Sequence, residues 1–350
     1  MTDWESLVPR ISRLVCEDEV SGLAVNKNFI VCQFWIQPEI AVFSRGSLEL
    51  FRLLEGHEYG GQCVAILDNG IVFSASLDRT LRSWNAKTGE QIDQANDHTD
   101  YVQCLCVHGD WVATGGQGDK KIMVYRADNQ GKLTRLYTCC GHSGWVRRLA
   151  ILGDKMVSGS LDMTVRVWDL STGTQIRSLP TDAAVMSLSL ATLNMVLYGD
   201  KAGRVSFLNL ESGSCTHLVP SLRLGMDKYR RALKFHDGSV DALVFIPEER
   251  LIVTGSDDKF VRLWRIENWQ EDVKQTEITE IDTVREHSDY INGVVIRDNI
   301  MYSSSGDINV IIHEYPNDNI QSCVEEFKVS TQETTPFIPF IPALLSPPSP

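Results

Sequence analysis

The stretch that decides the fold begins at Gly141-His142, continues through Ser158-Gly159-Ser160-Leu161-Asp162, and ends at Val165-Arg166-Val167-Trp168-Asp169. Its short alternating and β-branched runs, at 157–160 and 165–168, predict β-strands of about five residues. Asp162 precedes Trp168 by six residues and is expected in a tight turn between the two strands. The stretch therefore predicts a small antiparallel unit framed by one His, one Asp and one Trp.

This unit recurs along the chain. The His positions are His57, His98, His142, His236 and His287, which are 41, 44, 94 and 51 residues apart. The gap of 94 covers two repeats, with Thr181 in place of the missing His. The six-residue spacing recurs in Asp78 and Trp84, Asp119 and Tyr125, Asp162 and Trp168, Asp258 and Trp264, and Asp307 and His313. A period of about 40–45 residues with these ends is typical of the blades of a β-propeller.

On these motifs the chain resembles the WD-repeat family. The resemblance implies an all-β fold, a seven-bladed propeller with four-stranded blades around a central channel. Six blades follow from the repeats, and four strand-like runs within 20–54 predict a degenerate first blade. The fifth repeat has Ala202 and Leu208 where the Asp and Trp are expected. Either 7–14 or 322–329 is expected to supply the outer strand that closes the ring.

The recurring polar residues are expected to brace each blade. The His can reach the turn Asp, and a Ser or Thr on the preceding strand can extend the network to the Trp N–H, because buried polar groups need partners. This structural network comprises His57, Asp78, Trp84, His98, Asp119, His142, Ser158, Asp162, Trp168, His236, Asp258, Trp264, His287 and Asp307. With Ser, His and Asp assigned to structure, and the nine Cys scattered without zinc-ligand spacing, we expect no catalysis, cofactor or metal.

Composition narrows the class of protein. The 350 residues are 43% apolar and 23% charged, as in an ordinary globular domain. We expect an N-terminal segment at 1–17, the propeller at 18–329, and a disordered Pro-rich tail at 330–350. The net charge of −13 argues against nucleic acid as a partner. No apolar run reaches the ~20 residues of a membrane span, and the missing signal-peptide pattern favours cytoplasm or nucleus.

The resemblance also implies a binding face, the top face, where the His-containing loops and the turn Asp residues lie. The family's contact positions there are three and five residues after the His and one before the Asp. Tyr, Trp and Arg among them are the types that dominate binding hot spots. These positions give Leu77, Tyr101, Gln103, Trp145, Arg147, Leu161, Asp241, Asp257 and Tyr290 as the candidate partner site. A basic insertion adds Arg223, Lys228, Arg230, Arg231 and Lys234.

The function expected from this pattern is a non-catalytic scaffold or adaptor that binds other proteins or peptide segments, phosphorylated ones included, alone or within a multi-subunit complex. The alternative is a substrate-recognition subunit of a ubiquitin ligase. The short links between the strands of a blade are similar to those of F-box-type WD-repeat receptors. In those receptors the position that matches Arg147 carries an Arg that binds a phosphorylated peptide. Leu161 and Met186 stand where those receptors carry further Arg residues, and we expect no F-box.

Overall fold

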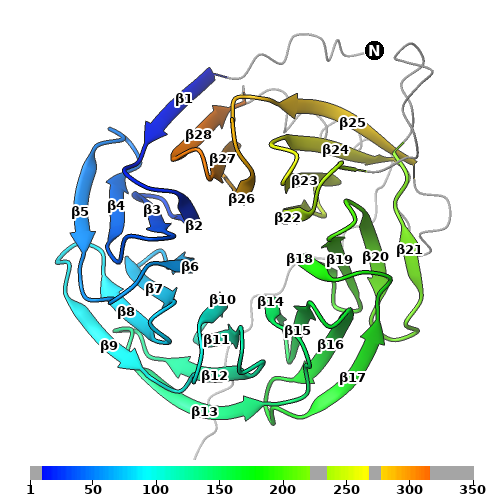
Figure 1. Cartoon of the computed structure of the whole chain (residues 1–350), viewed down its shortest axis with the longest axis horizontal. Coiled ribbons are helices and arrows are strands. Elements are labelled where there is room, and N and C mark those ends of the chain that lie inside the picture. The colour runs from blue at the N-terminus through cyan, green and yellow to red at the C-terminus, as the bar shows by residue number, and fades with distance from the viewer. Residues whose placement is uncertain (1–9, 221–234, 268–276, 316–350) are drawn as a thin grey trace, which may run out of the picture.

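The structure, a computed structural model, describes residues 10–220, 235–267 and 277–315. Within these ranges the regular elements are β-strands, which form seven antiparallel four-stranded sheets around a central axis (Figure 1). In six of the sheets the strands are hydrogen-bonded in chain order, so each repeat builds one blade. The seven-bladed propeller expected from the repeats is confirmed.

The blades follow the chain around the ring. Blades one to three consist of β2 (Val20–Val25), β3 (Phe29–Phe34), β4 (Ile40–Ser44) and β5 (Leu50–Leu54); β6 (Gly61–Ile66), β7 (Ile71–Ser76), β8 (Leu81–Asn85) and β9 (Gln91–Ala95); and β10 (Val102–His108), β11 (Trp111–Gly116), β12 (Ile122–Ala127) and β13 (Leu133–Cys139). Blades four to six consist of β14 (Val146–Leu152), β15 (Lys155–Ser160), β16 (Thr164–Asp169) and β17 (Gln175–Pro180); β18 (Val185–Thr192), β19 (Met195–Asp200), β20 (Val205–Asn209) and β21 (Cys215–His217); and β22 (Val240–Ile246), β23 (Leu251–Ser256), β24 (Val261–Glu267) and β25 (Glu277–Val284). Blade seven consists of β26 (Ile291–Arg297), β27 (Ile300–Ser305), β28 (Asn309–Glu314) and β1 (Arg10–Val15).

Blade seven is closed by the N-terminal strand. β1 pairs antiparallel with β28, in a register that runs from Arg10↔Glu314 to Val15↔Asn309. Of the two segments expected to close the ring, the N-terminal one therefore supplies the strand, and the propeller sheets include residues before 18. The other segment, 322–329, and the Pro-rich tail, 330–350, lie outside the described residues.

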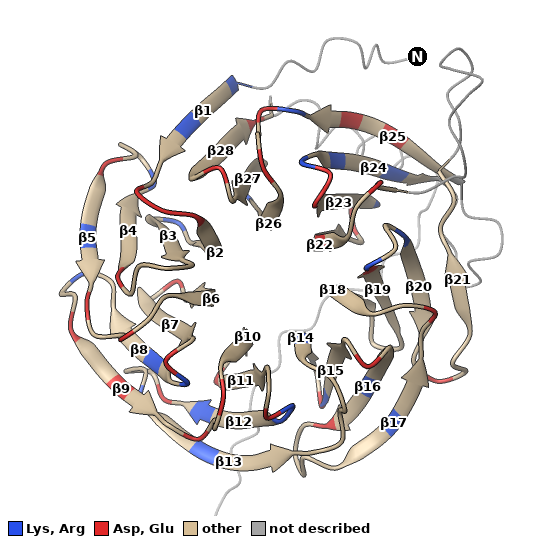
Figure 2. Cartoon of the chain, viewed as in Figure 1, with Lys and Arg blue, Asp and Glu red and all other residues tan. Residues whose placement is uncertain are grey.

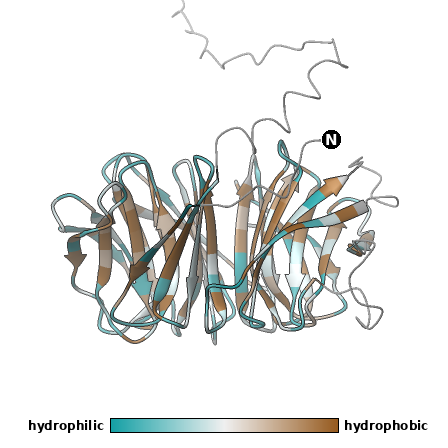
Figure 3. Ribbon diagram, turned by 90° about the horizontal axis from the view of Figure 1, so that it is seen from above, coloured by the Kyte–Doolittle hydropathy of each residue, from teal (hydrophilic) through white to brown (hydrophobic). Residues whose placement is uncertain are grey.

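The apolar core lies between neighbouring blades. A separate cluster of buried side chains fills each junction between adjacent sheets, and the N-terminal Leu14 belongs to the one between blades seven and one. The second strand of each blade carries almost no charge (Figure 2), while the loops at both ends of the ring are polar (Figure 3). The ring is thus held by face-to-face contact of sheets, and loops are free to differ.

Candidate functional site

The polar motif residues are engaged with one another inside the blades. In blade four, His142 Nδ1 lies 2.8 Å from Asp162 and its Nε2 2.7 Å from Ser158 Oγ, which also accepts the Trp168 Nε1–H at 2.8 Å. Burial lowers the pKa of His142, and Asp162 offsets this only in part. The pKa of Asp162 is lowered although burial opposes it, because Thr164, Ser143 and His142 hydrogen-bond to its carboxylate. These groups brace the fold.

The same arrangement recurs in the other motif-bearing blades. The His contacts the turn Asp through Nδ1 and a strand Ser or Thr through Nε2 in blades two, three, six and seven, around His57, His98, His236 and His287. Trp84 and Trp264 donate to that same hydroxyl, as Trp168 does. Tyr125, at the Trp position of blade three, donates instead to Asp97 at 3.0 Å.

Blade five replaces the motif with a different network. Asp200, fully buried at the end of β19, accepts hydrogen bonds from the backbone N–H of Ala202 and of Arg204. The Arg204 Nε–H donates to Asp200 at 2.7 Å. His217 on the outer strand contacts Ser206 and Asp182. The loss of the Asp and Trp in this repeat is therefore compensated by an acid two residues earlier.

An exposed aromatic arc crosses the top face of blades one to four. Its members sit in the β3–β4 turn or in loops that enter a blade's first strand. They are Trp35, Tyr59, Tyr101 and Trp145, with exposed fractions of 37, 61, 45 and 39%. The Leu161 N–H donates to the Trp145 carbonyl at 3.0 Å, which fixes the two top-face loops of blade four side by side. Large aromatic side chains held on rigid loops are suited to binding another protein.

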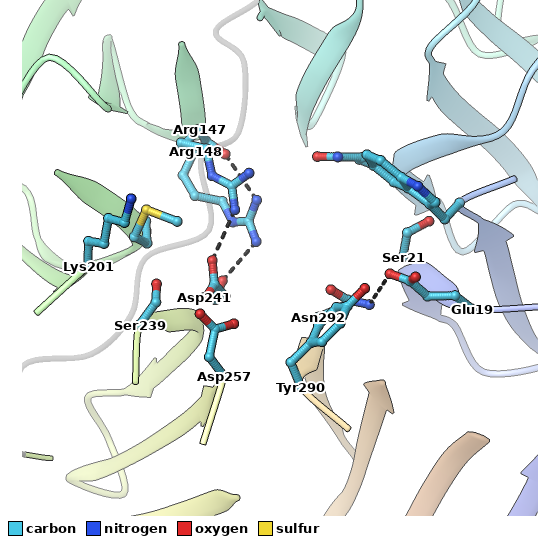
Figure 4. A pocket seen from close by; sticks show the side chains of 13 residues that line it. Glu19, Ser21, Arg147, Arg148, Lys201, Ser239, Asp241, Asp257, Tyr290 and Asn292 are labelled. Atoms are coloured by element: carbon cyan, nitrogen blue, oxygen red, sulfur yellow. Dashed lines mark hydrogen bonds and ion pairs between the residues drawn. The ribbon is translucent and has the colours of Figure 1, made fainter. Parts of the chain in front are cut away.

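Beside this arc, a polar cavity of about 310 Å³ opens at the mouth of the central channel, and we call it the channel-mouth pocket. Its basic wall is formed by Arg147 and Arg148 from β14 together with Lys201 from blade five. Asp241 and Asp257, both from blade six, face them (Figure 4). Glu19, Ser21, Trp35, Tyr290 and Asn292 complete the rim on the side of blades seven and one.

The charged groups of this pocket are only partly paired with one another. Arg147 forms an ion pair of 3.0 Å with Asp241, and Arg148 donates to the backbone carbonyls of Arg147 and Asp241 at 3.0 and 2.8 Å. Burial and the neighbouring Arg148 lower the pKa of Arg147. Burial and the adjacent Asp241 carboxylate raise the pKa of Asp257 to about 6. The pocket thus holds a carboxyl group that lies beside another group of the same charge.

The structure separates the predicted top-face residues into groups. Arg147, Asp241, Asp257 and Tyr290 come together in the channel-mouth pocket, whereas Tyr101 and Trp145 belong to the aromatic arc. Leu77 and Leu161 are half-buried beside the arc. The basic insertion, Arg223, Lys228, Arg230, Arg231 and Lys234, lies outside the described residues.

Gln103 requires a correction. It was expected on the accessible top face, but its side chain is only 1% exposed and its amide has no hydrogen-bond partner among the described residues. It occupies the irregularity between Val102 and Cys104 where the pairing of β10 with β11 shifts register. The side chain is therefore covered by the surrounding protein and is not available to a partner in this structure.

Sequence reasoning missed the contribution of blade one. Trp35, Glu19 and Ser21 line the pocket, yet their repeat has no His or turn Asp from which to count positions. The usable signal is the strand-like run that ends at Trp35, because Trp35 follows β3 in the structure as Leu161 follows β15. Arg148 was missed because it lies one residue beyond the counted position of Arg147, whereas Ser239 holds a counted position, three residues after His236, but was not among the residues chosen for the candidate site.

Among residues 10–220, 235–267 and 277–315, no helix has the length and apolar character that a membrane crossing requires. Nor do three or more His, Cys, Asp or Glu side chains gather there in a way that could hold a metal ion.

Two family models and several known proteins match parts of this chain. The model described as "WD domain, G-beta repeat" matches residues 89–126 and 227–265, and that of the "TEP-1 C-terminal beta-propeller" matches 142–210. A guanine nucleotide-binding protein subunit beta from Oryza sativa subsp. japonica is 27% identical over 64% of this chain and 60% of its own length. The WD repeat-containing protein pop2 of Schizosaccharomyces pombe is 30% identical, over 34% of this chain and 22% of its own length. Protein groucho of Drosophila melanogaster is 27% identical, over 53% of this chain and 26% of its own length. The chain thus covers less than two thirds of the length of each of these relatives.

Proposed function

Since the chain is a WD-repeat β-propeller, we propose that it is a non-catalytic interaction scaffold that binds segments of other proteins on its top face. The observation that carries the proposal is the aromatic arc, because four large aromatic side chains stand exposed on neighbouring blades of one face. Trp and Tyr are among the residue types that dominate binding hot spots. One similar protein is named a WD repeat-containing protein and another a subunit of a guanine nucleotide-binding protein, which supports an interaction role. Cytoplasm and nucleus remain the proposed locations.

The arc and the channel-mouth pocket together suit an extended segment. Trp35 belongs to both, so a peptide that crosses the top face would contact apolar rings over blades one to four and charged groups over blades four to seven. Loops on a rigid ring are well placed for such binding, because the fold holds them while their side chains differ.

A receptor for phosphorylated substrates of a ubiquitin ligase, the alternative, has less support. Its central residue would be Arg147, whose guanidinium is already paired with Asp241. Asp241 and Asp257 beside it would also repel a phosphate group. Co-purification of cullin-type subunits with this chain would revive the alternative.

The test compares two variants of the full chain. The first carries Trp35→Ala, Tyr101→Ala and Trp145→Ala. The second carries Leu136→Ala and Ile176→Ala, which remove exposed apolar side chains from the outer strands of blades three and four. Proteins that co-purify with each variant are quantified by mass spectrometry. We expect partners to fall about tenfold or more for the first variant only. Equal partner recovery from both variants and the unaltered chain would contradict the proposal.

A further inference from the structure

The Asp257 carboxyl in the channel-mouth pocket has no countercharge of its own. Its neighbour is Asp241, which already forms an ion pair with Arg147. Within the described residues no ion pair reaches Asp257, although the residue is exposed and lines the cavity. A carboxylate placed beside another carboxylate is unfavourable for the free protein, and a cation placed between them would relieve that repulsion.

The basic groups of the pocket do not fill this place. Arg148 is committed to the backbone carbonyls of Arg147 and Asp241. Lys201 stands on blade five, next to blade six (Figure 4), and among the described residues it forms no ion pair with Asp257. The acidic side of the pocket is thus open to a ligand.

A second observation, independent of the acidic pair, points to the same place. Ser239 is only 6% exposed, and its hydroxyl has no hydrogen-bond partner among the described residues. Figure 4 shows its Oγ directed into the pocket on the side of Asp241 and Asp257. Buried hydroxyl groups are almost always paired, so an unpaired one that faces a cavity marks a position for a ligand donor.

We propose that this pocket receives a single lysine or arginine side chain of the partner segment, which binds between Asp257, Asp241 and the Ser239 hydroxyl. The inference rests on the proposed function, whose partner it specifies. An ammonium or guanidinium group would donate charge-assisted hydrogen bonds to both carboxylates and to Ser239 Oγ. Trp35 and Tyr290 line the same cavity, and aromatic rings next to acidic groups favour a cation further.

Binding of this cation is coupled to a proton. The charged or titratable groups that act on Asp257 are Asp241, Arg147, Asp258 and Tyr290, with Glu19, Arg148 and Lys201 elsewhere on the cavity wall. Burial and Asp241 raise the pKa of Asp257 to about 6, so below that pH the site is protonated and neutral. A bound cation requires the ionised form. Affinity should therefore fall by up to about tenfold per pH unit as the pH drops below about 6.

The first experiment is a selection of short random peptides on the full-length chain. We expect enriched peptides to share one Lys or Arg at a fixed position relative to apolar residues. Selection on Asp257→Asn should lose the basic residue and keep the apolar ones. Selection on Asp237→Asn, which removes the same charge from an exposed position in blade six outside the pocket, should match the unaltered chain.

The outcomes separate the two proposals. Peptides that depend on Trp145 but carry no basic residue, or that ignore Asp257→Asn, would overturn the inference and leave the scaffold function standing. Peptides insensitive to every top-face change would overturn the scaffold function. For an enriched peptide, replacing Lys by acetyl-lysine or Arg by citrulline should weaken binding about tenfold to a hundredfold. Equal affinity of the neutral peptide would overturn the inference.

The pocket can also be tested without any peptide. The probe is n-butylammonium chloride, with n-butanol as the uncharged control, and the readout is tryptophan fluorescence, to which Trp35 contributes from the cavity wall. We expect a saturable change with the ammonium ion that disappears in Asp257→Asn and in Trp35→Phe and persists in Asp237→Asn. A response that is equal for the alcohol, or unchanged in Asp257→Asn, would overturn the inference.

Discussion

At the channel mouth, single residues occupy places where they lower the stability of the free protein. Asp257 would be better tolerated as a neutral group, because its neighbour Asp241 carries the same charge. Sites that bind ligands often hold such unfavourable groups, and the ligand supplies what the free protein lacks. Most of the motif residues are the opposite case, since His142, Ser158 and Asp162 satisfy one another inside the blade.

A stability measurement checks the state of Asp257. Its pKa is raised from 3.8 to about 6 on folding, so the folded chain holds the proton more tightly than the unfolded chain. The carboxyl therefore costs stability increasingly as the pH rises from 3.8 to about 6, and the full cost is present above that pH. We expect Asp257→Asn to raise the free energy of unfolding at neutral pH by about 1 kcal/mol, after allowance for solvent screening.

The measurement is chemical denaturation of both chains over this pH range. The gain should vanish as the pH approaches 3.8, where Asp257 is protonated in both states. Asp237→Asn serves as the control and should change little at any pH. A loss for Asp257→Asn would show that Asp257 has a favourable partner in the free protein, and a gain that is independent of pH would show that its charge is not what lowers stability.

At the scale of one blade, stability depends on a hydroxyl that serves two rings. Ser158 accepts from Trp168 and contacts His142, and in blades three and six Thr114 and Thr254 take the same place. Ser158→Ala would leave two buried ring nitrogens unpaired, which should cost about 2 to 4 kcal/mol. Ser158→Thr keeps the hydroxyl and should cost less than about 1 kcal/mol.

Thermal unfolding followed by circular dichroism distinguishes the two changes. Equal unfolding temperatures for Ser158→Ala and Ser158→Thr would mean that the hydroxyl carries no stability. In blade five other groups stabilise the turn between the second and third strands, because Asp200 and Arg204 form hydrogen bonds there without the motif. Element stability therefore depends on satisfied polar groups more than on particular residue types.

Across the whole molecule, the ring depends on one pairing between distant parts of the chain. β1 joins β28 in blade seven, and Leu14 packs into the cluster between blades seven and one. Arg45 adds a further tie at this junction through Tyr302 and Asp298. Closure removes the free sheet edges that an open array of blades would expose.

The contribution of β1 can be measured with two side chains of the same strand. Leu14 is 5% exposed and Ile11 46% exposed. Leu14→Ala should lower the free energy of unfolding by about 2 to 4 kcal/mol, because it empties part of a packed junction. Ile11→Ala should cost less than about 1 kcal/mol. Chemical denaturation would contradict closure by β1 if the two changes had equal effects.

Much of the fold was predictable because its rules are local. The His, Asp and Trp of a repeat lie within about 30 residues of one another, and their spacing indicates a turn and a strand in each copy. The strands of the degenerate first blade could also be located, because their apolar runs are flanked by turn residues. Blade count followed from the number of repeats. The closing strand did not, since two terminal segments had similar apolar patterns.

The binding site was predictable in part. Counting from the motif found Arg147, Asp241, Asp257 and Tyr290, which do meet in one pocket. It missed Trp35 and Glu19, because blade one has no motif, and it included Gln103, which a register shift in β10 leaves buried. Position within a repeat predicts which face a residue is on, but it does not give its burial or its neighbours from other blades.

By itself the sequence determined the blades, their order and the residues that brace them, because those interactions join residues of the same repeat. Only the tertiary structure decided that β1 closes the ring, that Arg147 pairs with Asp241 across the channel mouth, and that Asp257 is left without a countercharge. These outcomes depend on distances between residues that lie far apart in the chain. Those distances exist only once the blades have closed into a ring.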